Sequence, residues 1–246
     1  MVIITNIYNY AMFKKIISLL CDIFFPKICF GCQKQGTYLC EDCKGCFEIS
    51  QHQYCLCKKP KLLPKCCQCK NKKLDGLYFP FSYQKTFIKK LIYYFKYNPL
   101  IKELSQPLAS LIIDHFSLIE KQPEFLSNKN NFIIIPIPSH IQRLKWRGFN
   151  PSEEIAKELA RFLTIPLISN SLIKNKKTRP QTELSDEERK ENIKNVFIVK
   201  NQEKIKNKKI ILIDDVYTTG STMEEAAKIL KKAGAKEVIG VVLARG

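Results

Sequence analysis

Arginine, acidic side chains and long apolar runs are all scarce in this sequence. Asp and Glu number 23 against 41 Lys and Arg, which gives a formal net charge of +18 at pH 7. Such an excess of positive charge favours a polyanion, such as a nucleic acid, as a partner. Only six of the basic residues are Arg, however, and lysines spread along a whole chain are also typical of a solvated surface. Charge alone therefore leaves both interpretations open.

No apolar run in the sequence is long enough to span a bilayer. A short run at residues 16–20 has the position of a signal or lipoprotein peptide, but Asp22 interrupts the apolar stretch. Apolar side chains recur at helical spacing over residues 12–28, which favours an amphipathic helix that packs against a core. Residues 1–11 form an extension ahead of this helix, and the sequence leaves the start of the protein open between Met1 and Met12. The sequence therefore predicts a cytoplasmic protein without a membrane span.

Cysteine is absent from the last two thirds of the chain. All eleven cysteines fall between residues 21 and 69, and ten of them between residues 29 and 69. Thiols stay reduced in the cytosol, so a cluster of this density favours metal thiolates over disulfides.

Eight of these cysteines form two sets with the spacing of zinc ribbons. The first set is Cys29, Cys32, Cys40 and Cys43. The second set is Cys55, Cys57, Cys66 and Cys69. Two residues separate each pair in the first set, as in a tetrahedral Zn²⁺ site, whereas the first pair of the second set is one residue closer. Both sites would be closed and structural, so we expect zinc to fold this segment and not to act on a substrate.

The chain divides into three parts by composition. We expect an N-terminal extension and helix at residues 1–28, a zinc-ribbon module at residues 29–70, and an α/β domain at residues 77–246. In the third part, strand-type segments are expected at residues 79–83, 131–137, 210–213 and 237–243. Helix-type segments are expected at residues 86–96, 100–119, 151–162 and 221–233, and a long polar loop at 174–195. This alternation predicts a mostly parallel sheet.

The most informative motif follows the strand at residues 210–213. Asp214 and Asp215 come directly after this strand, and a hydroxyl-rich turn then leads into a helix. The turn consists of Thr218, Thr219, Gly220, Ser221 and Thr222. Ligands of open α/β sheets bind beyond the carboxyl ends of strands, and a helix N-terminus offers free N–H groups to an anion. The turn is therefore expected to hold a monophosphate, while the two carboxylates face either vicinal ribose hydroxyls or a divalent cation.

This motif resembles the signature of the type I phosphoribosyltransferases. The resemblance implies that residues 77–246 adopt that fold and bind 5-phosphoribosyl 1-diphosphate, with Mg²⁺ on its diphosphate. It implies that Asp214 and Asp215 bind the ribose hydroxyls and that the turn binds the 5-phosphate. The diphosphate needs cations, and four of the six arginines lie in two candidate segments: Arg143, Arg147, Arg179 and Arg189. The long polar loop would then close over the site and exclude water.

The combination of a cysteine-rich module and this domain is similar to the ComF (competence protein F) family. Further marks of the resemblance are Lys96-Tyr97, Ile135-Pro136-Ile137-Pro138, Arg147-Gly148-Phe149-Asn150, and the group Gln181, Leu184, Ser185, Arg189, Asn192 and Phe197. The resemblance implies a role in natural transformation. There the protein would handle incoming single-stranded DNA, alongside a helicase-like motor and a recombination mediator.

Two classes of function remain open on these residues. The chain is either an enzyme that transfers phosphoribose to an unidentified acceptor, or a non-catalytic DNA-binding adaptor that uses the fold as a scaffold or sensor. The lysines between residues 58 and 73, with Tyr54 and Tyr78 nearby for base stacking, favour DNA binding, although a solvated basic ribbon has the same composition. The two functions are compatible, and we expect a donor-binding protein that also contacts DNA.

Overall fold

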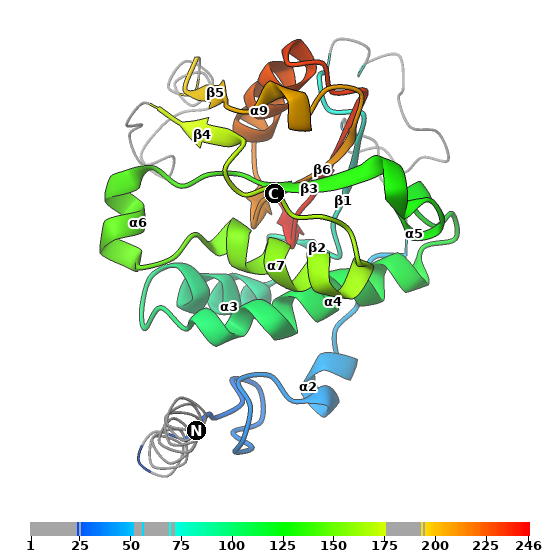
Figure 1. The fold of residues 1–246 in the computed structure, drawn as a ribbon. Coiled ribbons are helices and arrows are strands. Elements are labelled where there is room, and N and C mark those ends of the chain that lie inside the picture. Colours follow the sequence, from blue (N-terminus) through cyan, green and yellow to red (C-terminus); the bar gives the residue numbers. More distant parts are fainter. Residues whose placement is uncertain are drawn as a thin grey trace, which may run out of the picture. The chain divides into compact units, whose positions relative to one another are not determined.

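The chain divides into two compact units, Met1–Phe47 and Glu48–Gly246. The computed structural model describes residues 24, 26–51, 56, 69, 72–175, 193 and 195–246. The N-terminal extension and nearly all of the expected helix at residues 12–28 lie outside these residues. Figure 1 shows the elements of each unit. No helix in the described ranges is both long and apolar enough to cross a membrane.

Residues 26–47 of the smaller unit have little regular structure. A bridge pairs Ile28 with Gln35, and the helix α2 (Glu41–Gly45) follows. The buried side chains among residues 26–47 are those of Cys29, Leu39 and Cys40. So few buried apolar groups cannot offset the conformational entropy lost on folding.

The larger unit is built on a four-stranded parallel sheet. The strands are β1 (Gly76–Tyr78), β8 (Glu237–Val241), β6 (Lys209–Ile213) and β3 (Phe132–Pro136), in that spatial order. Every pairing between them is parallel. The last four residues of β6 are all buried, as expected for an interior strand that is covered on both faces. The expected α/β fold with a mostly parallel sheet is confirmed.

Helices cover both faces of this sheet (Figure 1). The helices α3 (Thr86–Lys96), α4 (Ser105–Leu118) and α7 (Pro151–Leu163) lie on one face, and α9 (Ser221–Lys232) lies on the other. A short turn, η2 (Lys102–Leu104), precedes α4. Pro107 therefore lies in the first turn of α4, where its missing N–H removes no helical hydrogen bond.

Several short elements complete the larger unit. The strands β2 (Phe81–Ser82), β9 (Ala244–Arg245) and β7 (Val216–Tyr217) form a parallel sheet, and β4 (Leu172–Lys174) pairs antiparallel with β5 (Phe197–Val199). The remaining elements are α5 (Glu124–Ser127), η3 (Lys129–Asn131), α6 (Ile141–Arg147) and η5 (Gln202–Lys204). The expected continuous strand at residues 79–83 is wrong. The chain leaves β1 after Tyr78 and enters β2 at Phe81, because Pro80 has no N–H to donate to a ladder.

Candidate functional site

A pocket of about 350 Å³ opens in the larger unit at the carboxyl ends of β3 and β6. Nine of the residues expected from the sequence line it: Arg143, Arg147, Asp214, Asp215, Thr218, Thr219, Gly220, Ser221 and Thr222. Parallel strands bring their carboxyl ends to the same edge of a sheet, so the loops that follow β3 and β6 meet there. One pocket therefore holds acidic, hydroxyl and guanidinium groups together.

The two carboxylates at the end of β6 have different surroundings. The Ser152 hydroxyl, near the start of α7, donates a hydrogen bond of 2.8 Å to Oδ1 of Asp214. The backbone N–H of Asp215 donates to the same oxygen at 2.9 Å. Oδ1 of Asp215 instead lies 2.8 Å from Nζ of Lys96, at the end of α3. Each carboxylate thus keeps its second oxygen for other groups in the pocket.

Burial and the adjacent charge of Asp215 raise the pKa of Asp214 to about 7, although Lys96 and the Ser152 hydroxyl act in the opposite direction. Burial also opposes the charge of Lys96, but the two carboxylates outweigh it and raise the pKa of this amine. Lys96 therefore stays a cation. Asp214 exchanges a proton near neutral pH.

The hydroxyl-rich turn is held in place by local contacts. The hydroxyls of Thr219 and Ser221 lie 2.8 Å apart, and the backbone N–H of Ser221 points to Oγ1 of Thr219 at 3.4 Å. Gly220 precedes α9 with a positive φ of 78°. A Cβ at this position would collide with the ring of Tyr217, so the glycine is required by this ring as well as by its φ. The turn thus carries its hydroxyls and the free N–H groups of α9 to the wall of the pocket.

Arg143 and Arg147 reach the pocket from α6, the helix after β3. Arg143 is exposed, whereas Arg147 is half-buried, and burial lowers the pKa of its guanidinium. In the described part of the chain, no group accepts a hydrogen bond from the buried Nε of Arg147. A buried N–H without an acceptor costs free energy, so this donor favours an anionic ligand.

Two lysines of the pocket were not identified as site residues from the sequence. Lys96 was noted only as part of a family motif, and Lys174, in β4, carries no sequence signal at all. Lys174 lines the pocket, and burial together with the nearby charge of Arg143 lowers the pKa of its amine to about 8. Both lysines come from segments far from the acidic motif, so only the folded chain brings them to it.

Asn150 lies at the expected N-cap position of α7, but its side chain makes no capping hydrogen bond. Instead its Nδ2 donates to the carbonyl of Ile137 at 2.9 Å, and its Oδ1 accepts from the Ser139 hydroxyl at 3.0 Å. The side chain thereby fixes the loop after β3.

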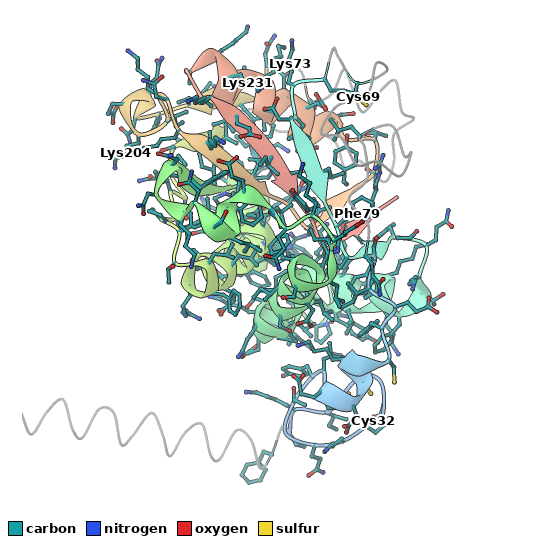
Figure 2. The ribbon with its side chains drawn as sticks, turned by 90° about the vertical axis from the view of Figure 1, so that its right-hand side faces the viewer. Cys32, Cys69, Lys73, Phe79, Lys204 and Lys231 are labelled. Carbon is teal, nitrogen blue, oxygen red and sulfur yellow. The ribbon has the colours of Figure 1, made fainter. Side chains whose placement is uncertain are left out.

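Tyr78 was expected to offer a ring for base stacking, and this expectation is wrong. Its side chain is 6% exposed and packs edge-on against the rings of Phe116 and Phe125 in the core. Lys73, from the same basic segment, is exposed on the larger unit (Figure 2). Arg179, Arg189, Tyr54 and most of the long loop lie outside the described residues.

The four cysteines of the first set lie close together in the smaller unit, where Figure 2 labels one of them, Cys32. Their sulfur atoms all lie within 4.8 Å of one another. The sulfur of Cys40 lies 3.7 Å from that of Cys29 and 3.5 Å from that of Cys32. A tetrahedral zinc site with Zn–S bonds of about 2.3 Å places its sulfurs about 3.8 Å apart. The four thiols can therefore hold one metal ion, consistent with zinc.

Backbone N–H groups support this sulfur cluster. The N–H of Cys40 points to the sulfur of Cys29, and the N–H of Cys43 to the sulfur of Cys40, both at 3.4 Å. Burial opposes ionisation of Cys29, but backbone hydrogen bonds outweigh it and lower the pKa of this thiol to about 6. Of the second set, Cys55, Cys57 and Cys66 lie outside the described residues. Cys69 is buried in the apolar core of the larger unit.

Known proteins resemble this chain over different shares of its length. The family model of the phosphoribosyl transferase domain matches residues 145–246. Competence protein ComFC of Streptococcus pneumoniae is 31% identical over 219 residues, which is 84% of this chain and 87% of that protein. Competence protein F of Haemophilus influenzae is 37% identical over 106 residues, and DNA utilization protein YhgH of Escherichia coli is 37% identical over 98 residues.

The extent of these matches differs. The Haemophilus match covers 43% of this chain and 46% of that protein, and the Escherichia match covers 39% and 42%. The chain thus spans less than half the length of these two relatives, but most of the Streptococcus protein. With a relative matched almost throughout, a phosphoribosyl transferase domain at the C-terminal end and a four-cysteine cluster ahead of it, this chain belongs to the ComF family.

Proposed function

We propose that the pocket binds 5-phosphoribosyl 1-diphosphate with Mg²⁺, in a protein that handles single-stranded DNA entering the cytoplasm during natural transformation. One observation carries the first part of this proposal. A single pocket combines a carboxylate pair, a hydroxyl-rich turn at a helix N-terminus, and guanidinium groups. These are the groups that a ribose carrying phosphates on two sides requires.

Each group of side chains in the pocket suits a different part of the donor. The turn from Thr218 to Thr222 would bind the 5-phosphate, because free N–H groups and hydroxyls both donate to phosphate oxygens. Asp214 and Asp215 have oxygens that would accept from the ribose hydroxyls or bind Mg²⁺. Arg143 and Arg147 would bind the diphosphate, and the unpartnered Nε of Arg147 would gain an acceptor.

Further cations would complete the diphosphate site. Lys174 lies in the pocket and would become fully charged beside a diphosphate, because an anion favours the protonated amine. Arg179 and Arg189 are proposed to join from the long loop. Mg²⁺ would supply positive charge to the diphosphate as it leaves.

A transferase reaction fits these groups. The bond between the anomeric carbon and the diphosphate breaks, and a bond to an acceptor forms at the same carbon. The chain would contribute mainly by fixing the ribose between Asp214, Asp215 and the turn, and by stabilising charge on the departing diphosphate. The hydrogen bonds that hold Asp214 and the turn in the ligand-free protein favour this positioning role.

A non-catalytic adaptor is the second candidate function. The ion pair of Lys96 with Asp215 favours it, because a donor must compete with this pair for the carboxylate. Release of diphosphate on addition of acceptor candidates separates the two functions. An adaptor would bind the donor and release none.

The role in DNA handling rests on the family. Two of the similar proteins are named for competence and one for DNA utilization. The net charge of +18 suits a polyanionic strand. Zinc is proposed to fold the module of Cys29, Cys32, Cys40 and Cys43, and a second zinc to bind the later cysteines. A helicase-like motor and a recombination mediator are the proposed protein partners.

Calorimetric titration of the zinc-loaded protein with the donor and Mg²⁺ tests the pocket. We expect saturable binding to the native chain, and loss of that binding in the double variant Asp214→Asn, Asp215→Asn. The variant Glu120→Gln, Glu203→Gln is the matched control, because it changes the net charge equally at two exposed acids outside the pocket. This control should bind like the native chain. Absence of donor binding to the native chain would contradict the proposal.

A further inference from the structure

Two segments of the larger unit contain no acidic residue. Residues 76–102 and 125–152 lack Asp and Glu, although they carry nine Lys and Arg in all. These stretches include α3 and α6. Elsewhere the surface helices pair their charges, as in α7 with Lys157 and Glu153 and in α9 with Lys228 and Glu225. The positive charge of α3 and α6 has no such compensation within either helix.

Exposed aromatic rings gather on the same two helices. Tyr93 is 50% exposed, Tyr97 at the end of α3 is 41% exposed, and Trp146 in α6 is 62% exposed. They are three of the five strongly exposed aromatic side chains in the described ranges. The buried face of α3, with Ile88, Leu91, Ile92 and Phe95, packs into the core and so turns Tyr93 outward.

Direct contacts join these rings into one surface, which we call the aromatic strip (Tyr93, Tyr97, Trp146 and Arg147). The rings of Tyr93 and Tyr97 lie 5.5 Å apart at an angle of 33°. The guanidinium of Arg147 lies 5.4 Å from the Tyr97 ring and 5.9 Å from the Trp146 ring, and so bridges the two helices. Figure 1 shows α6 and α3 on the same side of the larger unit.

The aromatic strip leads into the pocket. Tyr93, Tyr97 and Arg147 are also among the residues that line the pocket, whereas Trp146 is not. The same two helices carry further exposed cations: Lys89, Lys90, Arg143 and Lys145. A molecule bound along the strip would thus approach the ligand in the pocket.

We propose that the aromatic strip binds single-stranded nucleic acid, with bases stacked on Tyr93 and Trp146 and phosphates beside the exposed cations of α3 and α6. Flat rings and cations on two helices that carry no acidic residue match unpaired bases joined by phosphates. In a duplex the faces of the bases are stacked on one another and cannot stack on protein rings. An acidic peptide could pair its carboxylates with the cations, but it has few aromatic rings to stack on Tyr93 and Trp146. This proposal rests on the proposed function, because it takes the bound strand to be the incoming DNA. It places the contact with that strand on α3 and α6, outside the cysteine module.

The chain has a single tryptophan, Trp146, so its fluorescence reports on the strip alone. Titration of the full, zinc-loaded chain with an oligothymidylate of about 20 nucleotides should quench this fluorescence to saturation, and added salt should weaken the binding. Heparin, a polyanion without bases, is the comparison ligand. It should compete for the cations without producing the same quenching.

The double variant Tyr93→Ala, Trp146→Ala should bind a labelled oligothymidylate at least about tenfold more weakly by fluorescence anisotropy, as expected for the loss of stacking. The matched control is Phe162→Ala, which removes a 59% exposed ring from α7 and should leave the affinity unchanged. Thermal unfolding of each variant verifies the fold.

Binding of the oligothymidylate without a change in Trp146 fluorescence would overturn the proposal, as would equal quenching by heparin or by a polyglutamate peptide. Unchanged affinity in the double variant would also overturn it. All these titrations omit the phosphoribosyl donor. A failure of donor binding would therefore contradict the proposed pocket function while leaving the strip intact, and a failure at the strip would leave the pocket intact.

Discussion

Among residues 26–47 of the smaller unit, three side chains are buried, whereas all five residues of β3 and four of the five in β6 are buried in the larger unit. The smaller unit instead brings four thiols within 4.8 Å of one another. Apolar burial stabilises the larger unit, whereas we expect residues 26–47 to depend on a metal ion held by the four thiols. The comparison teaches that metal removal and core mutations should act on different parts of the chain.

Loss of the metal at the first cysteine set should have the largest effect, and only on the smaller unit. Structural zinc contributes an apparent free energy of about 10–16 kcal/mol to folding in zinc-finger peptides at neutral pH. The variant Cys40→Ser should abolish protection from hydrogen exchange at residues 26–47 and leave β3 and β6 protected. Hydrogen exchange read by mass spectrometry checks both regions together. Loss of protection in β6 would contradict the separation, and so would a smaller unit that stays protected without metal.

A core mutation should give the converse result. Ile211 is 1% exposed in β6, so Ile211→Ala should lower the free energy of unfolding of the larger unit by about 2–5 kcal/mol. The zinc at the first cysteine set should stay bound, because the larger unit contributes none of its four thiols. Urea denaturation and metal analysis measure the two quantities. The control Ile198→Ala, at a position 40% exposed in β5, should have a much smaller effect.

The pH dependence of donor binding tests the role of Asp214 in the pocket, and its expected effect is smaller than that of the two preceding changes. Asp214 has a pKa of about 7, so it gains a proton as the pH falls below this value and loses the charge that favours hydroxyl donors and Mg²⁺. Donor affinity should therefore fall at low pH, by at most about tenfold per pH unit for one proton. Calorimetry at several pH values around neutrality measures this dependence.

The variant Lys96→Met separates the protein's titration from that of the donor. Lys96 lowers the pKa of Asp214, so its removal should raise that pKa and move the loss of affinity to higher pH. The donor's own phosphate groups titrate equally with both proteins. An unchanged pH profile in the variant would show that Asp214 does not control binding.

Local sequence was sufficient to predict the acidic motif and the first cysteine set. The apolar strand at Ile210–Ile213, the two aspartates and the turn before α9 are consecutive, so their order along the chain determines their order in space. The same holds for Cys29 to Cys43, where short spacings limit how far apart the sulfurs can lie. The alternation of apolar strands and helices was likewise sufficient for the parallel sheet.

Features that depend on packing between distant segments were not predicted. Lys96 contacts Asp215 across 119 positions of sequence, and nothing near either residue indicates the ion pair. The side-chain amide of Asn150 forms hydrogen bonds with Ile137 and Ser139 in the loop after β3, and the sequence at the start of α7 does not indicate these partners. Tyr78 has the composition of a stacking residue, but its ring packs against those of Phe116 and Phe125, from segments that follow it in the chain, and is therefore buried.

A crystal structure of the zinc-loaded protein with 5-phosphoribosyl 1-diphosphate and Mg²⁺ tests the central claim most directly. The account predicts the 5-phosphate at the turn before α9, the ribose hydroxyls or the cation at Asp214 and Asp215, and the diphosphate beside Arg143 and Arg147. Density for the donor elsewhere, or with its two phosphate ends exchanged, would contradict the assignment of the pocket.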